Sequence, residues 1–195
     1  MGKIWNPSKA GTPSVELADL SHTQRFHSVL DAGCGWGRNI SVFAAGARRL
    51  HAFDTDSEGV QATKECLEEV SAPDAEVQVW NGDLLITETS PPYDLVICYG
   101  VTHFLQRRER AIAYDRLKGW VRPGGLLAVA AFNTLVPIPD DLQAFMPDPP
   151  SDSSEVREAF AGWDIVFARS HVYDDEHEGD IRHTHSIDRL ILRRP

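Results

Sequence analysis

Three glycines at alternate positions, Gly33, Gly35 and Gly37, closely follow the short apolar run from His27 to Asp31. Because glycine has no Cβ, this spacing lets the backbone turn tightly from a strand into a helix and come close to a ligand. A strand that leads into a helix in this way begins a βαβ unit, whose two strands run parallel. This turn therefore constrains the fold more than any other segment does.

Apolar runs and segments with helical spacing alternate over the central part of the chain. The runs expected to form strands are His27 to Asp31, Leu50 to Phe53, Glu76 to Trp80, Tyr93 to Cys98 and Leu126 to Phe132. The segments expected to form helices are Val15 to Leu20, Asn39 to Ala45, Glu58 to Val70 and Arg108 to Val121. The last of these helices is expected to stop at Arg122-Pro123-Gly124-Gly125. Such alternation predicts a parallel sheet with right-handed crossovers.

The pattern changes near Asn133. The Pro- and Asp-rich stretch from Asn133 to Pro150 is typical of a long irregular loop, and its length makes it a candidate lid. A helix capped by Ser153 is expected to run to Ala161. Trp163 to Ala168 and Ile187 to Leu192 then follow without a helix between them, as an antiparallel pair would. The predicted fold class is α/β: a doubly wound, Rossmann-like, mostly parallel seven-stranded sheet with a C-terminal antiparallel strand pair.

Composition limits the classes of protein to consider. The chain has 195 residues, 42% of them hydrophobic, which suits one domain, residues 1–195. Within it we expect an N-terminal lead and helix (1–26), a cofactor-binding core (27–132) and a lid-like loop, helix and closing strands (133–195). A formal net charge of −10 disfavours nucleic-acid and membrane partners. Three widely spaced cysteines and no long apolar run favour a cytoplasmic protein with reduced thiols. The expected oligomeric state is left open as a monomer or a homodimer.

The residues around the glycine turn indicate which ligand it holds. The dinucleotide fingerprint has its third glycine at the position occupied here by Arg38, which disfavours a pyrophosphate. S-adenosylmethionine has none, and Asp31 can bind its ammonium directly or through water. Asp54, about 20 residues after the glycine turn, is placed to accept both ribose hydroxyls. Asp83 is placed to accept from the adenine amino group, with Leu84 or Leu85 against the ring. Each acid alone has a structural explanation, as a helix cap or a turn residue, but their joint occurrence in this order favours a cofactor site.

The motif series resembles that of the class I methyltransferases over about residues 27 to 132. The matching elements are Asp31-x-Gly33-x-Gly35-x-Gly37, Asp54, Asp83, the strand Tyr93-Asp94-Leu95-Val96, and Arg122-Pro123-Gly124-Gly125. Gly37-Arg38-Asn39, Val101 to Leu105, Gly124 to Ala131 and Phe160 to Val166 resemble the tellurite-resistance methyltransferases in particular. The resemblance implies a Rossmann-like fold and S-adenosylmethionine as methyl donor. The expected cofactor-binding residues are Asp31, Gly33, Cys34, Gly35, Gly37, Asn39, Asp54, Thr55, Asp83, Leu84 and Tyr99.

Residues on the acceptor side are less constrained by pattern. His103, just after the fourth strand, is the first candidate for a substrate contact or a general base, although a histidine packed at a helix start gives the same pattern. Arg182 is a candidate oxyanion contact, and it is equally consistent with a surface charge. The acidic, histidine-containing segment from His171 to His185 has the residue types of a metal site, but its spacing does not decide the matter, and we predict no metal.

Two functions from different classes fit these observations. The first is methyl transfer from S-adenosylmethionine to a small-molecule acceptor, for which the resemblance implies a soft nucleophile such as a chalcogen oxyanion or a thiol. S-adenosylhomocysteine would be the product. The alternative is a non-catalytic nucleotide-binding or regulatory module that keeps the sheet. Both bind the cofactor, but only the enzyme turns it over.

Overall fold

The computed structural model describes residues 11–140, 142–146, 148–150, 152–177 and 181–195. The elements are α1 (Val15–Thr23), β1 (Ser28–Ala32), η1 (Ser41–Phe43), β2 (Arg49–Asp54), α2 (Ser57–Val70), β3 (Glu76–Asn81), β4 (Tyr93–Tyr99), η2 (Thr102–Phe104), α3 (Arg107–Trp120), β5 (Val121–Asn133), α4 (Ser154–Ala159), β6 (Asp164–His177) and β7 (Ile181–Arg193). Part of the expected N-terminal lead, residues 1–10, lies outside the described residues. No helix in the described ranges is both long enough and apolar enough to cross a membrane.

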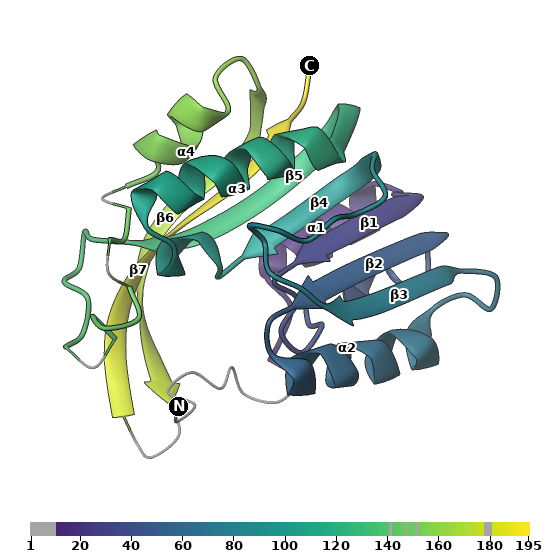
Figure 1. The fold of residues 1–195 in the computed structure, drawn as a ribbon, viewed down its shortest axis with the longest axis horizontal. Helices are drawn as coiled ribbons and strands as arrows, with labels where there is room; N and C mark the ends of the chain where they lie inside the picture. The colour runs from purple at the N-terminus through teal and green to yellow at the C-terminus, as the bar shows by residue number, and fades with distance from the viewer. Residues whose placement is uncertain (1–10, 141, 147, 151, 178–180) are drawn as a thin grey trace.

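All seven strands form one sheet, in the order β3-β2-β1-β4-β5-β7-β6 (Figure 1). The first five strands pair in parallel, and β7 pairs antiparallel with both β5 and β6. The chain starts in the middle of the sheet at β1, moves outward to β3, and then crosses back to β4 beside β1. This arrangement confirms the predicted fold class, including the closing antiparallel pair.

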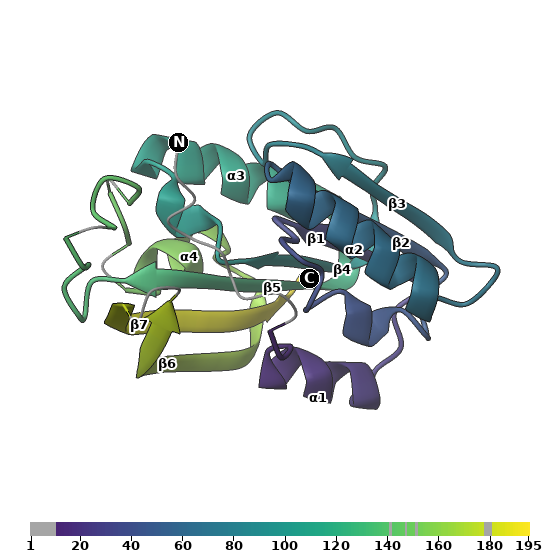
Figure 2. The same cartoon turned by 90° about the horizontal axis from the view of Figure 1, so that it is seen from below.

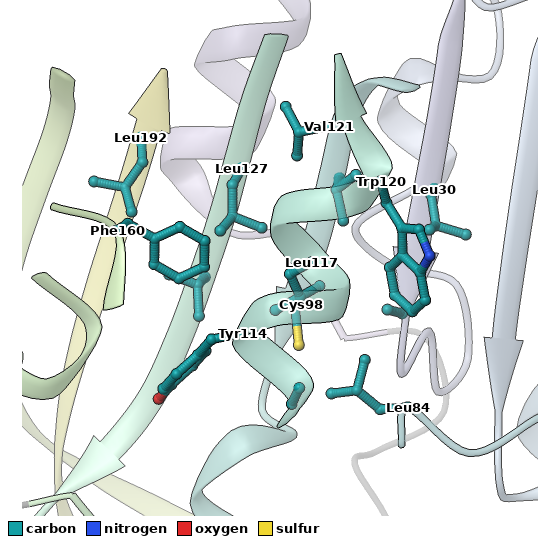
Figure 3. Packing of buried hydrophobic residues seen from close by; sticks show 14 of the residues in the cluster. Leu30, Leu84, Cys98, Tyr114, Leu117, Trp120, Val121, Leu127, Phe160 and Leu192 are labelled. Atoms are coloured by element: carbon teal, nitrogen blue, oxygen red, sulfur yellow. The ribbon is translucent and has the colours of Figure 1, made fainter. Parts of the chain in front are cut away.

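Helices cover both faces of the sheet, so each central strand is buried on both sides. One face packs against α3 and α4, where the side chains of Tyr114, Leu117 and Trp120 meet Leu127 and neighbouring strand residues (Figure 3). Burying each of these large side chains contributes about 1.5–3 kcal/mol. The opposite face packs against α1, η1 and α2. In Figure 2, α1 lies below the sheet and α3 above it.

Two local expectations were wrong. The helix predicted from Asn39 to Ala45 is only a single 3-10 turn, Ser41–Phe43. It lies between Gly37 and Gly46, which leave too few residues to repay the cost of starting an α-helix. The strand predicted from Leu126 starts at Val121, because Val121 pairs with Tyr93, and Arg194 exchanges backbone hydrogen bonds with Gly124 and Gly125. The segment from Arg122 to Gly125 thus lies after the end of α3, as expected, but it is part of β5.

The closing hairpin is longer than the sequence pattern indicated. Its pairing extends from Asp164↔Arg193 to His177↔Ile181, well beyond the expected runs of six residues each. Polar residues fill the distal half, which hides the apolar alternation on which a strand prediction rests. The hairpin therefore reaches past the carboxyl end of β5.

The stretch from Asn133 to Pro150 is irregular, as expected, but it packs against the sheet. The Thr134 amide donates to the Pro150 carbonyl at 3.1 Å, so the two ends of the stretch lie together. Leu142 and Met146 are buried against Phe132. Near the end of this stretch, the Asp148 carbonyl accepts a hydrogen bond from the buried Arg110 of α3. Arg110 also makes a two-point ion pair with Glu155 of α4. This stretch covers the carboxyl end of β5.

Candidate functional site

The glycine turn lies between the ends of β1 and β2 and the segment that follows β4. All three glycines have positive φ, +88° at Gly33, +51° at Gly35 and +78° at Gly37, a conformation that favours glycine. The amide of Gly33 donates to the Phe53 carbonyl at 2.8 Å. A Cβ on Gly33 would lie 2.1 Å from Cγ2 of Val101. The turn thus needs glycine for both its conformation and its packing.

The α2 helix supports the turn from one side. The Thr63 hydroxyl donates to the Gly35 carbonyl at 2.8 Å. A Cβ on Gly59 would lie 2.7 Å from the same carbonyl oxygen. Sequence reasoning missed both residues; the only signal was a glycine within a helical pattern, which often marks close packing. Gly59 and Thr63 therefore hold the turn against the first turns of α2.

Asp31 is the second-last residue of β1 and lies just before this turn. Its side chain is almost completely buried, at 2% exposure, and Oδ2 has no hydrogen-bond partner among the described residues. Burial is the main reason that the pKa of this carboxyl rises from 3.8 to about 8; the negative charge of Asp54 adds to the rise and Arg38 opposes it. A buried carboxylate without a partner is costly, and a cationic ligand group removes that cost. Asp31 therefore fits the ammonium of S-adenosylmethionine.

Asp54 and Asp83 lie at the carboxyl ends of adjacent strands. Asp54 accepts hydrogen bonds from the amides of Gly35 at 2.8 Å and Asp56 at 2.9 Å, which orient its carboxylate beside the turn. Asp83 accepts from the Leu85 amide at 2.8 Å. The Gly82 amide donates to the Asp54 carbonyl at 3.0 Å, so the two loops lie next to each other. The structure brings the three acids to one edge of the sheet, where open α/β sheets bind ligands.

The other expected cofactor residues occupy different environments. Thr55 is exposed beside Asp54, and Leu84 is buried in the core beneath α3. Asn39 is buried, and its side-chain oxygen accepts from the Ser14 amide at 3.1 Å, which ties the start of α1 to the turn. Burial, followed by the charge of Asp31, raises the pKa of the Cys34 thiol. Cys34 is therefore a protonated packing residue with little nucleophilic character.

Tyr99, at the end of β4, belongs to a polar group that sequence reasoning did not find. Its hydroxyl donates to Glu16 at 3.0 Å, and Arg189 of β7 contacts both oxygens of the same carboxylate at 3.2 and 3.4 Å. Glu16 is buried in the first turn of α1. Burial and the Glu16 carboxylate raise the pKa of Tyr99, so the phenol stays protonated. This group joins α1 to two strands at the edge where Asp31 lies.

His103 and Arg182, the two candidates on the acceptor side, are placed differently. His103 is buried at 1% exposure, with its ring between Phe104 at 4.2 Å and Phe132 at 4.5 Å between centroids. Burial, followed by the nearby His185, lowers its pKa to about 3. Arg182 is exposed near the distal end of the hairpin and outside the packed cluster that holds His103.

His171, His183 and His185 lie on one face of the hairpin, together with Tyr173. The ring of His185 stacks on Phe132 at 4.6 Å, and His183 lies 5.5 Å from His185. Among the residues that the structure describes, no group of three or more His, Cys, Asp or Glu side chains is arranged to hold a metal. Glu178 to Asp180 lie outside the described ranges. These imidazoles form part of an aromatic stack beside the end of β5.

The site matches a known family in sequence and known proteins in structure. The methyltransferase domain family matches residues 29–125, from β1 to the first residues of β5. The chain carries a class I methyltransferase domain. S-adenosylmethionine is the cofactor of this domain, and the unpartnered Asp31 carboxylate and the glycine turn fit it. No curated protein matches the sequence.

Solved structures share the fold of the methyltransferase domain at low identity. TehB from Haemophilus influenzae is 17% identical with a TM-score of 0.74; the match covers 93% of this chain and 62% of that one. The N-methyltransferase NodS from Bradyrhizobium japonicum, in complex with S-adenosylhomocysteine, is 15% identical with a TM-score of 0.67, covering 92% and 84%. Magnesium protoporphyrin IX methyltransferase from Synechocystis, also with bound S-adenosylhomocysteine, is 18% identical with a TM-score of 0.66, covering 92% and 80%. The chain thus spans less than two thirds of TehB.

Proposed function

We propose that this protein transfers the methyl group of S-adenosylmethionine to a small, soft nucleophile, either a chalcogen oxyanion or a thiol. The observation that carries the donor half of the proposal is the buried Asp31 carboxylate, just before the glycine turn, with its unpartnered oxygen. The acceptor half is supported by the resemblance to the tellurite-resistance methyltransferases and by the covered edge of the sheet.

The residues of the chain would divide the binding of the donor among them. Asp31 holds the ammonium, and the backbone of the glycine turn lies against the amino acid end. The Asp54 carboxylate, oriented by the Gly35 and Asp56 amides, accepts from the ribose hydroxyls. Asp83 accepts from the adenine amino group. The sulfonium supplies a methyl group with a good leaving group, so the protein mainly aligns the acceptor and excludes water.

A small acceptor suits the edge of the sheet beyond Tyr99. Leu142 and Met146, from the stretch that follows β5, pack on Phe132 and Ile187 and cover this edge. A protein or nucleic-acid acceptor would need an open groove across the same surface. The negative net charge also disfavours nucleic acid as the acceptor.

The proposal is tested in two steps with purified protein. Calorimetric titration with S-adenosylhomocysteine should show micromolar binding by the wild type and its loss in Asp54→Ala. Asp74→Ala removes an exposed acid paired with Arg48 outside the site, and it should bind like the wild type. Turnover to S-adenosylhomocysteine is then measured with tellurite, selenite and 2-mercaptoethanol.

The outcomes separate the two functions. Binding with turnover of at least one acceptor supports the enzyme. Binding without turnover of any of them favours the non-catalytic nucleotide-binding or regulatory module, and absence of binding rejects both. The oligomeric state, monomer or homodimer, and the cytoplasmic location remain predictions. Light scattering and cell fractionation test them.

A further inference from the structure

One buried hydrogen-bond donor beside the acceptor edge has no partner among the described residues. The Phe132 amide donates to Nδ1 of His103 at 3.1 Å. Nδ1 must therefore present its lone pair, which places the proton of a neutral imidazole on Nε2. Nε2 is buried and makes no hydrogen bond to any residue that the structure describes. A buried donor rarely lacks a hydrogen-bond acceptor in the protein unless a ligand or a water accepts its hydrogen bond.

The orientation of this donor is set by its surroundings. The ring of His103 lies between Phe104 and Phe132, and the bond from the Phe132 amide prevents it from flipping. His103 lies in η2, only two residues after Val101, whose side chain occupies the space beside Gly33 of the glycine turn. The donor is therefore held rigidly between the cofactor turn and the covered end of β5.

These contacts also argue against the general base that the sequence suggested. A base needs a free lone pair, but the Nδ1 lone pair is occupied and Nε2 carries the proton. Burial lowers the pKa of His103 to about 3, which further disfavours an imidazolium. The group can donate a hydrogen bond but is a poor proton acceptor.

We propose that His103 is a catalytic hydrogen-bond donor, whose Nε2–H binds a lone pair of the acceptor and orients it toward the methyl group. The inference rests on the proposed function. It narrows the class of acceptor, because a nucleophile that meets a donor and no base must arrive deprotonated. An oxyanion such as tellurite or selenite, or a thiolate, meets that condition, whereas a protonated thiol or an alcohol needs another group to take its proton.

Two variants separate the donor from the packing role of the ring. His103→Asn keeps an oxygen near Nδ1 for the Phe132 amide but has no donor near Nε2. His103→Gln keeps an N–H near Nε2 but loses the acceptor for the Phe132 amide. If His103 is a catalytic donor, His103→Asn should lower kcat about 100-fold. The kcat of His103→Gln should stay within about tenfold of the wild-type value. The order of Tm should be reversed, with Gln the less stable variant.

The kinetic comparison uses tellurite, selenite and 2-mercaptoethanol with saturating S-adenosylmethionine. Affinity for S-adenosylhomocysteine should be unchanged in both variants, because His103 is not among the residues proposed to hold the methyl donor. If kcat follows Tm across the two variants, the role of His103 is structural and the proposal is overturned. A wild type that methylates none of the three acceptors overturns the proposed function, and the donor is then judged on the spectroscopic measurement alone.

Nitrogen NMR on histidine-labelled protein provides that measurement. The His103→Gln spectrum identifies the His103 signals by their loss. The wild type bound to S-adenosylhomocysteine should show an unprotonated Nδ1 and a protonated Nε2, and adding tellurite or selenite should shift Nε2 without changing the tautomer. A protonated Nδ1, or an Nε2 signal unaffected by every probe, would overturn the proposal.

Discussion

Asp31→Asn should abolish a gain in the free energy of unfolding that the wild type shows as the pH falls, because the variant lacks the buried carboxyl that takes up the proton. In the free protein the pKa of Asp31 is about 8, against 3.8 in an exposed carboxyl. The folded state therefore binds more protons than the unfolded state between these values, and stability is gained as pH falls through this range. The asparagine variant has no proton to bind there and should lose this dependence.

The magnitude follows from the two pKa values. At pH 8.0 the native carboxyl is about half protonated, and at pH 6.5 it is almost fully protonated, while the unfolded carboxyl stays ionised. The wild type should gain about 1.6 kcal/mol relative to the variant over this interval. His103 opposes this gain in both proteins, because its pKa of about 3 in the folded protein makes stability fall as the unfolded imidazole protonates. This contribution is the same in the wild type and in the variant, so the difference between them isolates Asp31.

Urea denaturation of both proteins at the two pH values measures this difference. Binding should show the opposite sign, because the ammonium of S-adenosylhomocysteine pairs with the ionised carboxylate. Acidification from pH 8.0 to 6.5 should weaken binding by the wild type roughly fifteenfold, following the ionised fraction of a group with pKa about 8. If wild type and variant change stability equally between the two pH values, Asp31 does not have a raised pKa and the argument for an unpaired carboxylate fails.

Three further predictions concern the glycine turn, with Gly119 as its control, the amino end of β4, and the stretch that follows β5. Gly59→Ala places a Cβ 2.7 Å from the Gly35 carbonyl, so calorimetry should show at least tenfold weaker binding of S-adenosylhomocysteine. Gly119→Ala in α3, where nothing lies within 4 Å, should bind normally and be no less stable. Asp94→Asn removes the negative charge of a carboxylate that accepts from the His27 and Ser28 amides at 2.8 Å each. Urea denaturation should show that the free energy of unfolding falls by about 1–3 kcal/mol. A fall of less than about 0.5 kcal/mol would contradict this role. If residues 133–150 act as a lid, limited proteolysis there should slow when S-adenosylhomocysteine is added, and equal rates would reject the lid.

The sheet and the acidic side of the site were predictable because both depend on short-range patterns. Near-continuous apolar runs at β4 and β5 require burial on both faces, and Asp54 ends β2 while Asp83 follows β3, two strands whose carboxyl ends share one edge. Where the local pattern conflicts with long-range pairing, the prediction failed. Residues 122–125 have the composition of a turn, yet their backbone pairs with Arg194, about seventy positions later in the chain.

The group of Glu16, Tyr99 and Arg189 and the surroundings of His103 were harder to predict, because they depend on partners that are distant in sequence. Glu16 and Arg189 are 173 positions apart, and each alone is consistent with a surface charge on an amphipathic element. His103 was found from its position after β4, but its chemistry depends on the amide of Phe132, 29 positions away, which determines which nitrogen holds the proton. The position of a histidine in the sequence can thus make it a candidate site residue. Only the backbone contact distinguishes a donor from a base, and under the proposed function that distinction limits the acceptors to those that arrive with a free lone pair.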